Sequence, residues 1–179
     1  MKTIILIAML SLTRICLSQE KMISKSGKIT FEASVPSFEE VKATNTNVTF
    51  VLNRTTGEIA SLALMKGFGF KVALMEEHFN ENYIESDQYP KAIFKGKIEG
   101  FDLSLLTEKP KDFTINGKLE LHGKSKDITI TARINKYKTG IVILSYFKVN
   151  ASDFNIAIPS LVKSKVSNTI NIEIAALLK

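Results

Sequence analysis

A regular alternation of apolar and other side chains runs through most of the chain after Gly27, and it constrains the fold more than any other feature. In "KITFEA" alternate residues from Ile29 to Ala33 are apolar, and in "NVTFVL" those from Val48 to Leu52 are. Successive side chains of an extended strand point to opposite faces, so a period of two indicates strands with one buried face. The pattern therefore predicts a mainly β protein.

The alternation recurs often enough to predict about eight strands. The further segments are "EIASLALM", "KAIFKGKIEGF", "DFTINGKLELHG", "DITITARI", "TGIVILSYFKV" and "NTINIEIAAL". Short links such as the turn at residues 53–57 favour antiparallel pairing in a barrel or a sandwich. Glycines alternate with large residues on one face of "KAIFKGKIEGF", which suits a curved sheet that closes on itself. An eight-stranded barrel can hold one small ligand.

Two segments break the alternation. In "KVALMEEHFNENY" the residues Val72, Met75 and Phe79 fall on one helical stripe, which predicts a short helix over about residues 71–80. A loop that contains Pro159 precedes the last strand.

The N-terminal segment has the pattern of a secretory signal peptide. Its apolar run, from Ile4 to Leu12, is shorter than the roughly 20 residues that a membrane-spanning helix needs, and Arg14 follows it. Small residues then precede Gln19. We therefore expect residues 1–18 to be removed and residues 19–179 to form one periplasmic or secreted domain.

The composition narrows the chemistry of that domain. Cys16 is the only cysteine, so the cleaved chain has no disulfide, thiol nucleophile or thiolate metal ligand. The formal charge is +6; without Lys2 and Arg14, 22 basic residues face 18 acidic ones, which leaves +4. The lysines alternate with apolar residues instead of clustering, which argues against nucleic-acid binding. Weak contact with an anionic membrane surface is compatible with this charge.

His78 and the acids around it are the first candidate for chemistry. His78 and Glu81 are spaced so that they share a helical face, but a zinc site needs three or four ligands. No metalloprotease spacing and no nucleophile elbow is present, and the only other histidine, His122, has the context of a turn contact. A solvated acidic helix face is the favoured interpretation, and an enzyme that uses His78 is an alternative.

The large, deformable apolar side chains are the second candidate. Phenylalanine and methionine with few polar groups suit a pocket for a long apolar ligand, although a filled core is the alternative. Phe68 and Phe70 flank glycines just before the helix, where we expect the pocket mouth. The expected lining residues are Met65, Phe68, Phe70, Met75, Phe79, Phe94, Phe113, Phe147 and Phe154.

Three segments, in order, resemble runs of the YceI-like proteins, a lipocalin-like, polyisoprenoid-binding family. The first is "HFNENYIESDQYPKAIFKGKI", residues 78–98, and the others are "GKLELHGKSKDITI" and "SDFNIAIPSLV". In the last of these, Asn155 stands where the family usually has glycine. The resemblance covers about residues 27–178. The matching residues of the first run are His78, Asn82, Tyr83, Ser86, Asp87, Tyr89, Pro90, Ala92 and Phe94.

The resemblance implies an eight-stranded antiparallel barrel with a short helix over one end and an apolar interior tunnel. It implies an exported protein that binds an isoprenoid or quinone-like lipid, in a family that is not known for a catalytic residue set. We expect no cofactor and no metal. The first run then becomes the joint between helix and strand, held by His78, Tyr83, Asp87, Tyr89 and Pro90. A structural or interaction protein with a filled barrel is the main alternative, and the oligomeric state is not indicated.

Overall fold

The computed structural model describes residues 20–179, so the expected signal peptide at residues 1–18 lies outside the described residues. Within the described part, nine antiparallel strands form one sheet. They are β1 (Lys21–Ser34), β2 (Lys42–Asn53), β3 (Glu58–Leu64), β4 (Gly69–Phe70), β5 (Lys91–Ile98), β6 (Lys111–Leu121), β7 (Lys124–Tyr137), β8 (Gly140–Asn150) and β9 (Val166–Leu178).

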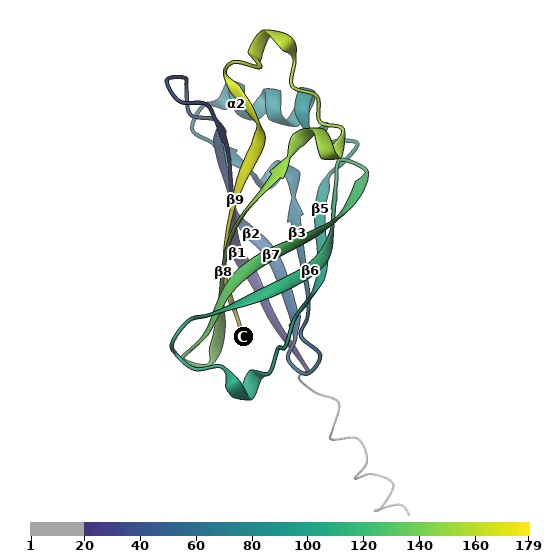
Figure 1. Cartoon of the computed structure of the whole chain (residues 1–179). Coiled ribbons are helices and arrows are strands. Elements are labelled where there is room, and N and C mark those ends of the chain that lie inside the picture. Colours follow the sequence, from purple (N-terminus) through teal and green to yellow (C-terminus); the bar gives the residue numbers. More distant parts are fainter. Residues whose placement is uncertain (1–19) are drawn as a thin grey trace, which may run out of the picture.

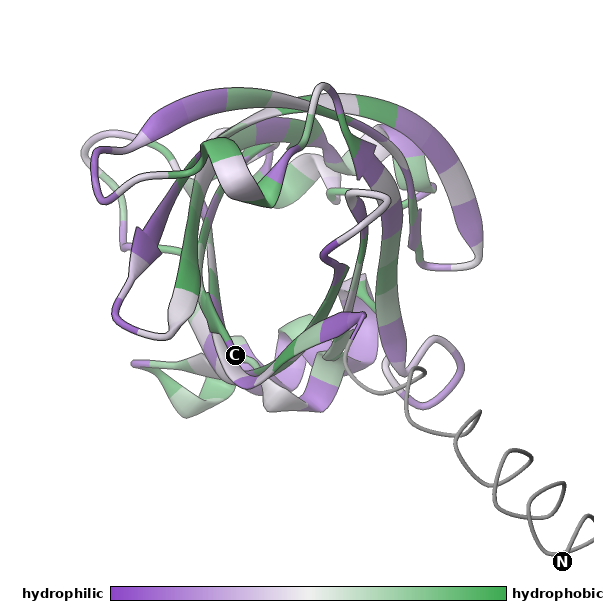
Figure 2. Ribbon diagram, turned by 90° about the horizontal axis from the view of Figure 1, so that it is seen from below, coloured by the Kyte–Doolittle hydropathy of each residue, from purple (hydrophilic) through white to green (hydrophobic). Residues whose placement is uncertain are grey.

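The sheet closes into a barrel. Its order is β1-β9-β8-β7-β6-β5-β3-β2-β4, and β1 pairs with β2 as well as with β9. Eight strands therefore form the ring in the described residues, and the two-residue β4 adds only to β2. Figure 2 shows this closed ring along the barrel. The predicted eight-stranded antiparallel barrel is confirmed, and closure leaves the long strands without free edges.

One short helix lies at one end of the barrel, and the C-terminus lies toward the other (Figure 1). The helix α2 (Ala73–His78) continues into a wider helical turn, η3 (Phe79–Tyr83), so the predicted helix is confirmed and extends further along the chain. None of the helices in residues 20–179 has the length and apolar character needed to cross a membrane. Single 3-10 turns occupy η2 (Met65–Gly67), η4 (Leu103–Leu105), η5 (Ala151–Phe154) and η6 (Ser160–Val162).

Two glycines face each other across β5 and β6. Gly96 and Gly117 are register partners in β5 and β6, and the ring of Phe94 covers both. A Cβ atom at Gly117 would lie 2.5 Å from Cζ of Phe94 and 2.6 Å from the carbonyl oxygen of Lys95. Glycine at both positions therefore allows the aromatic ring to lie directly on the backbone of the closed sheet.

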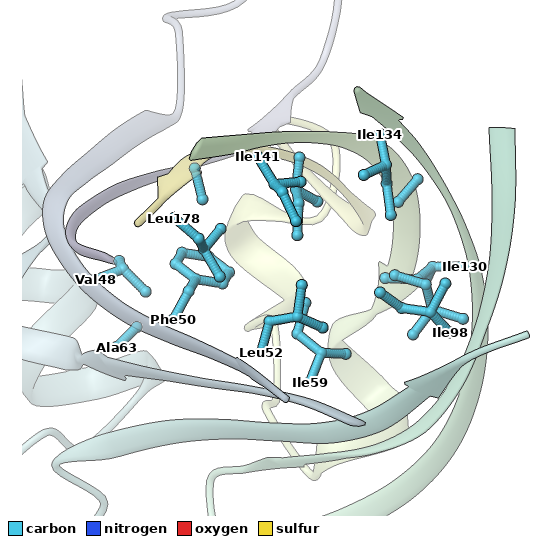
Figure 3. Packing of buried hydrophobic residues seen from close by; sticks show 14 of the residues in the cluster. Val48, Phe50, Leu52, Ile59, Ala63, Ile98, Ile130, Ile134, Ile141 and Leu178 are labelled. Carbon is cyan, nitrogen blue, oxygen red and sulfur yellow. The ribbon is translucent and has the colours of Figure 1, made fainter. Parts of the chain in front are cut away.

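Packed isoleucine and leucine side chains fill the C-terminal end of the barrel. We call this group the floor; it comprises Leu52, Ile98, Ile134, Ile141 and Leu178, and Figure 3 shows its packing. Each of these side chains has less than 2% of its surface exposed. All lie where their strands run to or from the end opposite α2. The floor therefore closes the barrel interior at that end.

Candidate ligand-binding cavity

A cavity of about 500 Å³ lies inside the barrel between the floor and α2. Its wall is built from the inward positions of the strands, such as Phe31 of β1, Ile128 of β7 and Ile172 of β9. The volume falls within the range of about 300–1,000 Å³ that is typical of ligand pockets. Besides tyrosine, the polar or charged side chains in the lining are Glu39, Ser61, His78, Ser145 and Lys165.

The wall residues show that this part of the interior is hollow. Ile128, Phe147 and Ile172 point inward, yet they are only half-buried, because they border open space and not other side chains. The hydroxyl of Ser145 is buried and donates a hydrogen bond of 2.7 Å to the carbonyl oxygen of Thr131 in the neighbouring strand. Because this hydroxyl already has a hydrogen-bond partner within the barrel wall, the surface that the cavity presents to a ligand is mainly apolar.

An aromatic cluster forms the wall beneath the helix. The ring of Phe31 lies 5.4 Å from that of Phe68, 5.7 Å from that of Phe70 and 5.2 Å from that of Phe79. The backbone N–H of Phe70 donates to a Glu76 carboxylate oxygen at 3.0 Å, which ties α2 to β4. Tilted and edge-on contacts of this kind hold the helix against the barrel.

The structure places eight of the nine expected lining residues on the cavity wall; the exception is Phe113. Phe113 is only 8% exposed, but it lies near the start of β6, at the floor end, and packs in the buried core. The prediction for Phe113 is therefore corrected. Phe31 also lines the cavity and was not among the expected residues, although the alternation in "KITFEA" places it on an inward face.

The mouth of the cavity can be located from residues that both line the cavity and are exposed. They are Phe38 and Glu39 in the β1–β2 loop, His78 at the end of α2, and Lys165 just before β9. The cavity therefore opens at the helix end of the barrel, between these three segments.

An ion pair joins two of the segments around the mouth. Lys71, which precedes α2, donates a hydrogen bond to Glu40 of the β1–β2 loop. This bond holds the pKa of the Glu40 carboxyl below its usual value and raises the pKa of Lys71. Both groups are thus charged at neutral pH, and the pair links the loop to the helix.

His122, and not His78, holds the joint between helix and strand. The His122 side chain is 9% exposed; its Nδ1 lies 3.0 Å from the carbonyl oxygen of Phe154 and its Nε2 lies 2.9 Å from Oε2 of Glu85. Its ring meets that of Tyr89 edge-on at 4.4 Å. The role expected for His78 is therefore corrected: His78 is exposed at the mouth of the cavity.

The other residues of the expected joint have separate positions. Tyr83 is half-buried and lines the cavity. Asp87 pairs with Lys66 at 2.5 Å. The carbonyl oxygen of Pro90 accepts a hydrogen bond of 2.9 Å from the backbone N–H of Met65, directly before β5 begins.

The acids near His78 in the sequence do not converge on it. Glu76, Glu85 and Asp87 are engaged with Phe70, His122 and Lys66 as described. Over residues 20–179, no three histidine, cysteine, aspartate or glutamate side chains lie close enough together to hold a metal ion.

Comparison with known proteins agrees with the geometry. Residues 19–177 match the model of the YceI-like domain. The chain belongs to the YceI-like family. The residue Asn155, which follows η5, has a left-handed backbone, with φ of 58° and ψ of 22°, a conformation that asparagine tolerates better than most residues. No curated protein sequence matches the chain.

Solved structures share the fold of this YceI-like chain at low sequence identity. A polyisoprenoid binding domain from Saccharophagus degradans, implicated in plant cell wall breakdown, has a TM-score of 0.77 at 13% identity, covering 89% of this chain and 98% of its own. BcnA from Burkholderia cenocepacia has a TM-score of 0.71 at 14% identity, with coverages of 86% and 96%. A Campylobacter jejuni YceI protein has a TM-score of 0.60 at 21% identity, with coverages of 81% and 89%.

Proposed function

We propose that this YceI-like barrel binds and carries a long apolar ligand, an isoprenoid or quinone-like lipid, in the cavity between α2 and the floor. The observation that carries the proposal is the apolar cavity of about 500 Å³ with its mouth at one end. Removing apolar surface from water contributes roughly 25 cal/mol per Å², so a long chain that fills this space would be held mainly by burial. The polyisoprenoid-binding neighbour from Saccharophagus degradans supports the ligand class.

The distribution of polar groups supports one orientation of the ligand. Glu39, His78 and Lys165 lie at the mouth, whereas phenylalanine and isoleucine line the wall below it. A head group would remain at the mouth, within reach of these three side chains. The tail would point toward the floor.

The two alternatives fit the structure less well. A filled barrel that serves only as a structural or interaction protein would not retain half-buried inward side chains around open space. An enzyme centred on His78 would need partner groups, and three of the five acids near it in the sequence, Glu76, Glu85 and Asp87, are engaged elsewhere. We therefore propose binding and not catalysis, and no cofactor.

We further propose that residues 1–18 direct export and are removed, which would make the barrel periplasmic or secreted. The support is the sequence pattern of that segment. Cell fractionation followed by intact-mass measurement tests this. A chain that begins at Gln19 outside the cytoplasm is expected, and an uncleaved cytoplasmic chain would contradict the proposal.

The ligand can be identified directly and its position checked with a fluorescent reporter. Mass spectrometry of an organic extract of the purified protein should show a bound isoprenoid or quinone. The chain contains no tryptophan, so Phe147→Trp places a single reporter in the cavity wall, and Tyr146→Trp places one on the 56%-exposed neighbouring position. After removal of lipid, decylubiquinone should quench Phe147→Trp strongly and Tyr146→Trp weakly. Equal quenching, or none at position 147, would contradict binding in the cavity.

A further inference from the structure

The loop at residues 155–165, which we call the mouth loop, presents an apolar side chain to solvent. Leu161 is 89% exposed and is the most exposed large apolar residue in the described part of the chain. It lies on η6, where the backbone N–H of Val162 donates to the carbonyl oxygen of Pro159 at 3.0 Å. A second bond of 2.8 Å, from Lys165 to Val162, follows. Leu161 is therefore held outward on a hydrogen-bonded turn.

The same loop forms part of the cavity. Ile156, Ile158 and Val162 line the interior, so apolar surface continues from the cavity through the loop to Leu161. Figure 1 shows the loop projecting beyond the helix end of the barrel. A single exposed leucine is ordinary on a protein surface, but one that continues an apolar cavity at its mouth indicates a contact surface.

The charge of the mouth loop indicates what it contacts. Lys163 and Lys165 follow Leu161 and are exposed, and no acidic residue occurs between Asp153 and Glu173. An exposed apolar side chain beside lysines matches the interface of an anionic bilayer, where lysines attract the lipid phosphates and the apolar group enters the acyl boundary. The exposed acids Glu77 of α2 and Glu81 of η3 would be repelled by an anionic surface, which favours contact through the loop over contact through the helix.

We propose that the mouth loop docks the barrel onto an anionic membrane surface, with Leu161 inserted and with Lys163 and Lys165 against the phosphates. This inference builds on the proposed lipid binding. Docking would place the mouth on the bilayer, and an apolar ligand would then pass into the cavity without crossing water.

A tryptophan in place of Leu161 tests the insertion on the full chain. Leu161→Trp is expected to show a blue-shifted emission with vesicles of phosphatidylcholine and phosphatidylglycerol. Leu105→Trp is the control, because Leu105 is 67% exposed at the opposite end of the barrel, in η4. It should show no shift, which also separates docking from any binding by the N-terminal segment. No shift at position 161, or an equal shift at both positions, would reject the proposal.

Charge reversal tests the lysines. The double variant Lys163→Glu/Lys165→Glu should lower partitioning onto the anionic vesicles at least about tenfold and abolish the preference over pure phosphatidylcholine. Lys95→Glu/Lys97→Glu changes the net charge equally on the exposed face of β5 and should retain most of the binding. Equal losses in both variants would reject the loop as the docking surface.

The two proposals fail independently. If the organic extract contains lipid but the emission of Leu161→Trp does not shift with vesicles, only the docking proposal is rejected. A protein that docks but has an empty cavity after purification and titration rejects only the lipid binding.

Discussion

Glu85 and His122 lie 37 residues apart in the sequence, yet Oε2 of Glu85 is 2.9 Å from Nε2 of His122. Both residues have a positive φ, 47° and 50°, a conformation that few residues other than glycine adopt. The second ring nitrogen of His122 meets the carbonyl oxygen of Phe154 at 3.0 Å. The His122 side chain therefore joins the segment before β5, the β6–β7 turn and η5, which directly precedes the mouth loop.

His122→Ala should lower the free energy of unfolding by about 1–3 kcal/mol, because the carbonyl of the fully buried residue Phe154 loses its partner. Denaturant titration measures the loss. His78→Ala is the control: that side chain is exposed, and its removal should change the free energy by less than about 0.5 kcal/mol. Equal losses would show that His122 is not the residue that holds the joint.

The contacts of His122 with Glu85 and Phe154 could not be predicted from the sequence. The local context of acids made His78 the more prominent histidine, whereas the partners of His122 come from segments 32 and 37 residues away. The period of two predicted the eight strands and their inward faces, because that signal is local. It could not separate Phe94, on the cavity wall, from Phe113, near the floor, since both point inward and differ only in their height in the barrel.

Gly117→Ala should destabilise the barrel by about 1–3 kcal/mol, because the new methyl group would overlap the Phe94 ring and the carbonyl of Lys95. The matched control is Gly69→Ala, where the nearest atoms lie 4.0 Å from the new Cβ. It should leave the stability almost unchanged. Thermal unfolding of both variants makes the comparison, and a neutral Gly117→Ala would mean that β5 and β6 are further apart there.

The floor and the cavity wall should respond differently to truncation. Ile134→Ala removes a side chain that is fully buried among others, so a loss of about 2–5 kcal/mol is expected. Ile172→Ala removes a side chain that already faces the cavity, and fewer packing contacts are lost. In protein free of lipid, its loss should be well below that of Ile134→Ala in denaturant titrations. A comparable loss would indicate that the upper barrel is packed as tightly as the floor.

Filling the cavity from its wall should exclude the ligand without unfolding the barrel. Ile172→Trp adds volume on the inward face of β9, whereas Glu173→Trp adds the same ring at the exposed neighbouring position. Because the cavity of about 500 Å³ has room for the larger ring, Ile172→Trp should unfold near the temperature of the parent protein. Its lipid content by mass spectrometry should fall at least about tenfold, as expected when a pocket loses the space its ligand occupies. Unchanged lipid content in Ile172→Trp, or an equal fall in Glu173→Trp, would place the ligand outside the barrel.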